Sequence, residues 1–283
     1  MVPIEKKRPA GSPFAEPWST TEPVLMAEIV DPPQPRLGVS HLMLWMLGSG
    51  LLLSVHQQVS NPDTAGRPTW FQWHQTVIAV ISSIVYGPAI ASLIMVVFRK
   101  IRGGPRFPSQ PGHWLLLGIG SYTALQTAGY LLAMTLSYLA MTLSYRDILD
   151  DMAIKMGTAC LGHVTALILF AIAAYRIDER RYWRVLFVFL AAVQGVVALA
   201  YGCLATAGVR FSDSIWALAR IAFYGTPAVV LAAMILVVVL DHRRAKGRDW
   251  LHRVGVLVQL LASLLSLISI AAFTLLQRLY PFQ

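Results

Sequence analysis

Seven apolar runs, most of them longer than 20 residues, constrain this chain more than any other feature. As a helix, a run of this length crosses a hydrocarbon core of about 30 Å. Lipid offers backbone groups no hydrogen-bond partner, so the runs should be helices, and they lack the alternating pattern of β-barrel strands. The sequence therefore predicts an all-α, polytopic membrane protein, a bundle of seven transmembrane helices within a domain at 37–283. The predicted spans are 37–57, 73–98, 114–139, 153–175, 185–208, 215–240 and 254–277.

The charged residues support this interpretation by their scarcity. They make up 13% of the chain, against roughly 25% in soluble domains. A water-soluble fold of 283 residues could not cover its apolar surface with so few charges. The formal charge of +9 does not indicate nucleic-acid binding, because no basic helix face or aromatic-basic module is present.

Lys and Arg alternate between segments in a way that predicts orientation. The N-terminal tail and the second, fourth and sixth loops hold 17 of them, and the other three loops together with the C-terminal segment hold 5. Cytoplasmic segments are enriched in Lys and Arg. We therefore expect the inner or plasma membrane, with a cytoplasmic N-terminus and the C-terminus outside.

The first 36 residues have a different composition from the rest. Eight of the 16 prolines fall here, and proline at this density prevents helix formation. The apolar residues are too scattered to offset the entropy of ordering. We expect residues 1–36 to be a disordered cytoplasmic tail.

A tandem repeat, AMTLSYL followed by AMTLSYR, occupies 133–146. Seven added residues lengthen a helix while turning its faces by only about 20°. The repeat aligns a stripe of small residues that permits close helix packing, Ala133, Ser137, Ala140 and Ser144. We expect a longer helix whose stripe could dock another membrane protein. The alternative is a ligand site built from Thr135, Ser137, Thr142 and Ser144.

A fainter repeat relates the second and sixth spans. Tyr86-Gly87-Pro88 in one corresponds to Tyr224-Gly225 and Pro227 in the other. The helices that follow carry Gln126 and Gln259. Two three-helix units in parallel orientation, joined by the fourth span, would form the 3-1-3 arrangement found in some transporters. Gly87, Pro88, Gly225 and Pro227 are then candidate hinges. The alternative is two ordinary kinked helices.

Polar residues at depth in a membrane are candidates for function. His163 and Arg220 lie within predicted spans, together with the neutral Gln126 and Gln259. These four are the predicted binding residues. No Asp or Glu lies deep in a span, so a carboxylate proton relay has little support.

Two other chemistries use histidine and cysteine. His41 with His113, and His56 with His74, could each form a bis-histidine haem site. Cys160 and His163, with Cys203, have a spacing that could bind a metal, although buried inert thiols are the simpler interpretation. The acidic trio Asp147, Asp150 and Asp151 could hold a cation or cap a helix.

The absence of motifs limits enzymatic interpretations. The chain contains no P-loop, HExxH, GxSxG or CxxC sequence. We therefore predict no catalytic residue, metal or cofactor. The leading hypothesis is a small-solute transporter or permease. A non-catalytic scaffold or partner subunit and a membrane haem protein are the alternatives.

Overall fold

The computed structural model describes residues 38–60, 69–101, 108, 110–142, 151–177, 181–207, 213–242 and 248–280. These residues form seven α-helices and no strand, which confirms the predicted all-α class. The predicted tail at 1–36 and the acidic residues Asp147 and Asp150 lie outside the described residues. The helices are α1 Val39–Ser60, α2 Thr69–Ile101, α3 Pro111–Thr142, α4 Asp151–Arg176, α5 Arg181–Ala207, α6 Asp213–His242 and α7 Trp250–Leu279.

Each helix covers one predicted apolar run and usually extends a few residues past it, because polar residues cap and continue a helix beyond its apolar stretch. The start of α7 is an example. Asp249 is its N-cap, and the side chain accepts a hydrogen bond from the amide of His252. Such a cap satisfies one of the amides that a helix start leaves unpaired.

Six of the described helices are long and apolar enough to cross a membrane, and α3 is not among them. The prediction of seven spans is therefore not confirmed. The middle of α3 carries Gly, Ser, Tyr, Thr and Gln where the other helices carry mostly Leu, Ile and Val. This composition suits a helix that other helices surround, and residues 111–120 of α3 are all buried.

Glycines in and around α3 explain how closely its neighbours approach. A Cβ atom added to Gly118 would lie 2.4 Å from the ring of Phe170 on α4, and one added to Gly120 would lie 2.5 Å from the carbonyl oxygen of Ala89 on α2. A Cβ at Gly112 would lie 2.1 Å from the carbonyl oxygen of His252 on α7. These glycines are needed for packing because no larger residue fits between the helices.

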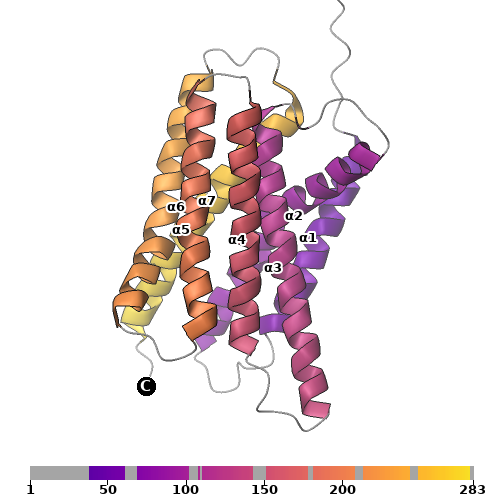
Figure 1. Ribbon diagram of the computed structural model, residues 1–283. Helices are drawn as coiled ribbons and strands as arrows, with labels where there is room; N and C mark the ends of the chain where they lie inside the picture. Colours follow the sequence, from indigo (N-terminus) through magenta and orange to yellow (C-terminus); the bar gives the residue numbers. More distant parts are fainter. Residues whose placement is uncertain are drawn as a thin grey trace, which may run out of the picture. The chain divides into compact units, whose positions relative to one another are not determined.

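The helices run side by side, and α3 lies between α4 and the pair formed by α1 and α2 (Figure 1). It packs against α1, α2, α4 and α7. The remaining contacts join α1 to α2, α4 to α5, α5 to α6, and both α2 and α6 to α7. The result is a bundle in which the first part of α3, residues 111–120, is enclosed by its neighbours, whereas the rest of α3 and the other six helices have exposed residues.

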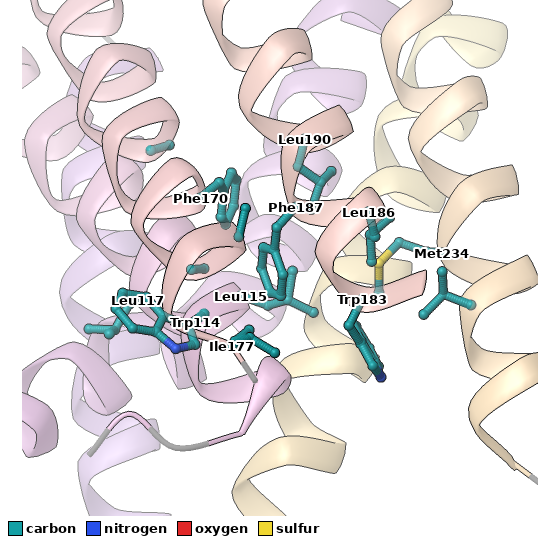
Figure 2. Packing of buried hydrophobic residues seen from close by; sticks show 14 of the residues in the cluster. Trp114, Leu115, Leu117, Phe170, Ile177, Trp183, Leu186, Phe187, Leu190 and Met234 are labelled. Carbon is teal, nitrogen blue, oxygen red and sulfur yellow. The ribbon is translucent and has the colours of Figure 1, made fainter. Parts of the chain in front are cut away.

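The main hydrophobic core joins α3, α4, α5 and α6 (Figure 2). The rings of Phe170 and Phe187 lie 5.8 Å apart, and those of Trp183 and Phe187 lie 6.2 Å apart. Met234 of α6 is completely buried in the same cluster. Tilted aromatic pairs at these separations stabilise a core beyond the burial of their area.

The outer faces of the bundle are apolar. Ile84, Leu161 and Ile221 are 63%, 60% and 70% exposed, and large aliphatic side chains are exposed on all seven described helices. Soluble monomers rarely expose apolar surface on this scale. The fold is therefore compatible with an integral membrane protein.

The tandem repeat falls at the end of α3. The helix has 32 residues and continues through the first copy into the second, as far as Thr142. Its end projects beyond α4 (Figure 1). Ala133 is fully buried and Ser137 is half-buried, whereas Ser144 lies outside the described residues. Docking of another membrane protein on this stripe stays a prediction.

Candidate functional site

A polar cavity of about 180 Å³ lies among α2 to α7 and is called the central cavity below. None of its lining residues is Asp, Glu, Lys or Arg. The polar groups come from six different helices, so the fold as a whole assembles the site. They are Tyr86, Tyr122, His163, Gln194, Thr226, Gln259, Ser263 and Ser266.

His163 is held in a defined orientation on the wall of this cavity. Its Nδ1 lies 2.5 Å from Oε1 of Gln194, and because that oxygen can only accept, Nδ1 carries the proton. The ring stacks on Tyr201 at 5.2 Å and packs against Tyr122 at 4.5 Å. The neutral imidazole therefore retains Nε2 as a hydrogen-bond acceptor.

A second cavity of about 160 Å³ lies among α1, α2 and α3. It shares Tyr86 and Tyr122 with the central cavity, so these two residues border both spaces. Its lining residues also contain no Asp, Glu, Lys or Arg. Other polar groups on its wall are His56, Ser82, Thr123, Gln126, Thr127 and Tyr130.

The predicted binding residues divide between these spaces and the surface. The structure brings His163 and Gln259 together on the central cavity, whereas Gln126 lines the second cavity. Arg220 lies at an exposed position on α6 and lines neither cavity.

The four predicted hinge residues have different surroundings. Pro227 lines the central cavity, and Pro88 is half-buried in α2. A Cβ at Gly87 would lie 2.0 Å from Oγ of Ser49, so this glycine permits close packing of α1 on α2. A Cβ at Gly225 would meet nothing within 4 Å. The two glycines that the faint repeat aligns therefore have different local roles.

Sequence reasoning missed Tyr86, Tyr122 and Gln194 as lining residues. Tyrosine is common in membrane proteins near interfaces, and nothing in the sequence distinguished these residues from that group. The available signal was position. Tyr86 and Tyr122 lie within predicted spans, where a hydroxyl needs a partner.

A network of hydrogen bonds joins the start of α3 to the start of α7. Nε2 of His113 donates to the carboxylate of Asp249, at 3.0 Å from Oδ2. The amide of Asp249 donates to Oε1 of Gln110 at 3.2 Å. The amide of Gly112 donates to Nδ1 of His252 at 2.9 Å. We call Gln110, Gly112, His113, Asp249 and His252 the α3–α7 network.

A buried ion pair adjoins this network. Arg248 contacts both carboxylate oxygens of Asp241, at 3.2 and 3.3 Å, and the hydroxyl of Tyr182 donates to Oδ1 at 2.6 Å. Nε2 of His252 lies 3.9 Å from the other oxygen. These contacts tie α5 and α6 to the start of α7. From the sequence, His113 was a candidate haem ligand together with His41, and the other members of the network had no predicted role.

The pH dependence of stability should report on Asp249. Burial raises the pKa of its carboxyl, but hydrogen bonds from His113 and the His252 amide outweigh that effect, so the pKa lies below the ordinary 3.8. A lowered carboxyl pKa stabilises the fold above the unfolded value, and the contribution is lost as pH falls through the folded value. The melting temperature in detergent should therefore fall less below about pH 4 for Asp249→Asn than for the wild type. An identical decline in both proteins would contradict this assignment.

His41, His56 and His74, the other histidines of the haem hypothesis, make local contacts. Nδ1 of His56 lies 3.3 Å from Oγ of Ser83, and Nε2 of His74 lies 3.3 Å from the carbonyl oxygen of Ser269. The ring of His41 packs on Trp250 at 5.2 Å. The haem hypothesis stays a prediction, which a visible absorption spectrum tests. Cys160 and Cys203 are free thiols, and no group of three or more metal-ligating residues occurs within the described residues.

Comparison with known proteins adds no assignment. No family model, curated protein or solved structure matches the chain.

Proposed function

We propose that this chain is an integral membrane protein of seven spans that passes a small uncharged polar solute across the bilayer through the central cavity. The observation that carries the proposal is a cavity lined by hydroxyl, amide and imidazole groups, inside helices whose outer faces are apolar. Each such group requires a hydrogen-bond partner when it is buried, a requirement that an aliphatic side chain does not have. A bundle that only had to remain in lipid would be more stable with aliphatic residues at these positions.

The lining chemistry defines the class of solute. With no charged side chain on the wall, a charged solute would lose its hydration without gaining a partner. His163 offers an acceptor at Nε2, and Gln259 offers both a donor and an acceptor. A compact molecule with hydroxyl or amide groups matches this set. The volume of about 180 Å³ is below the roughly 300 Å³ at which pockets for drug-sized ligands begin.

Movement in this proposal comes from the helices that contain proline. Pro88 and Pro227 each lack an amide proton, which leaves a carbonyl one turn earlier without its helical donor. Pro227 and Tyr86, two residues before Pro88, both line the central cavity. Small rotations about these positions would change the shape of the cavity.

The 3-1-3 repeat would supply two units, α1–α3 and α5–α7, that rock against each other. In its support, His113 and Asp249 are separated by the same 136 positions as Trp114 and Trp250, and they bond to each other. The packing of the units differs, however. α1 packs on α3, whereas α5 with α7 is not among the closely packed pairs of described helices.

Orientation and location follow from the cation pattern. We propose the inner or plasma membrane, with the N-terminus in the cytoplasm and the C-terminus outside, because the densely basic segments alternate along the chain. α3 would then be a seventh span, with residues 111–120 enclosed by neighbouring helices.

Flux measurements test the proposed activity. Proteoliposomes should take up glycerol, urea or erythritol faster than protein-free liposomes, as measured by stopped-flow light scattering, and should leave sodium permeability unchanged. Gln259→Ala should slow the facilitated part by about threefold to tenfold, the net value of one hydrogen bond. Gln277→Ala, exposed on the same helix, is the matched control and should behave as wild type. The proposal fails if none of the uncharged solutes is taken up faster than by empty liposomes.

A further inference from the structure

The second cavity contains a buried hydroxyl without a partner. Thr123 is 6% exposed, and its Oγ1 has no hydrogen-bond partner within the described structure. A buried hydroxyl in this state costs free energy unless a water or ligand meets it. Because Thr123 lines the second cavity, that cavity is the place from which a partner could come.

Other serine and threonine residues in these helices show what Thr123 lacks. Ser83, Thr158 and Thr274 each donate a hydrogen bond to the carbonyl four residues earlier. Further residues do the same, namely Ser54, Thr76, Ser92, Thr135, Thr165, Thr206 and Ser266. This bond is the usual way to satisfy a hydroxyl inside an apolar helix. Thr123 is buried and does not make it.

His56 supplies an acceptor on the same wall. The hydroxyl of Ser83 donates its proton to the carbonyl of Ala79 at 2.7 Å. Nδ1 of His56, 3.3 Å from that hydroxyl oxygen, must therefore be the donor between them. The neutral ring then retains Nε2 as an acceptor, as His163 does at the central cavity. The two cavities thus combine uncharged hydroxyl groups with an imidazole acceptor.

We propose that the second cavity is a hydrated binding station for uncharged hydrogen-bonding molecules, with Thr123 contacting the bound molecule. It lies next to the central cavity, and Tyr86 and Tyr122 line both spaces. Along α3 the central cavity is lined from Gly118 to Tyr122, and the second cavity continues from Tyr122 to Tyr130. This inference rests on the proposed function: a solute that approaches from the C-terminal end of α3 would bind at the station before it reaches the central cavity.

Thiol labelling tests the station without any knowledge of the solute. In a background with Cys160 and Cys203 replaced by alanine, Thr123→Cys in proteoliposomes should react with methyl methanethiosulfonate, because thiols ionise and react only where water reaches them. Leu115→Cys, at a fully buried position of the same helix, should react many times more slowly. Equal, slow labelling of both cysteines would overturn the proposal.

Thr123→Val tests the hydroxyl itself, because valine has nearly the same shape. Glycerol or urea flux should fall by about threefold to tenfold. Thr274→Val, which removes an exposed and already bonded hydroxyl on α7, should have no such effect. Unchanged flux together with a raised melting temperature would overturn the role of Thr123, because it would identify a hydroxyl that only destabilises the fold. Fast labelling of Thr123→Cys in a protein that shows no flux would refute the proposed transport and support the hydrated station.

Discussion

Replacing Asp249 with alanine should destabilise the folded protein by about 3 kcal/mol, the cost of breaking a buried hydrogen-bonded pair. The substitution removes the N-cap of α7 and leaves the buried His113 without the carboxylate that it contacts at 3.0 Å. Loss of a cap alone costs about 1 kcal/mol. Unfolding followed by tryptophan fluorescence in mixed detergent micelles measures the change.

A double-mutant cycle with His113→Ala shows whether the pair is responsible. The double variant should be less destabilised than the two single variants added together, because the second change removes a group that the first left unpaired. Asp249→Asn, which can still cap α7, should retain part of the stability. If the two single effects simply add, the contact between α3 and α7 is not energetically coupled.

Adding one methyl group where α3 crosses α7 should have an effect of similar size. A Cβ at Gly255 would lie 2.0 Å from the carbonyl oxygen of Gly112. The obstructing atoms belong to the backbone, so no change of rotamer relieves the clash and the helices must move apart. We expect Gly255→Ala to lower the unfolding free energy by about 3 kcal/mol, at the upper end of overpacking costs.

Gly157→Ala on α4 is the matched control, because a Cβ there would meet nothing within 4 Å. Alanine is the better helix former by about 1 kcal/mol, so this variant should be neutral or slightly more stable. The same unfolding assay compares the two. Equal stability of Gly255→Ala and wild type would mean that α3 and α7 are not in close contact.

Much of the fold could be predicted because a membrane-spanning helix is recognisable from a single continuous segment of mostly apolar residues. The run at 254–277 carries no charged residue and is mostly Leu, Ile, Val and Ala, and the helix Trp250–Leu279 covers it. The length of α3 was also predictable, since a heptad repeat extends a helix without turning its faces. Composition alone does not determine whether α3 crosses the bilayer, because the middle of this helix carries polar and small residues, several of which line the two cavities.

The site was predictable in part. His163 and Gln259 were selected because a polar side chain within a membrane span is costly and therefore a candidate for function. Both line the central cavity. Tyr122 and Gln194 were not selected, since their role depends on which helices lie side by side. The bond between His113 and Asp249 joins residues 136 positions apart. A single sequence carries no signal for that pairing. The unsatisfied hydroxyl of Thr123 becomes visible only when its surroundings are known.

The position of α3 determines whether both cavities lie within the membrane, because α3 lines each of them. Reporters fused to the two chain termini, each active on one side of the bilayer only, measure this directly. Seven spans place the N-terminus in the cytoplasm and the C-terminus outside, so the two reporters should give opposite results. If the two reporters gave the same result, the number of spans would be even, which would contradict the placement of both cavities within the membrane around α3.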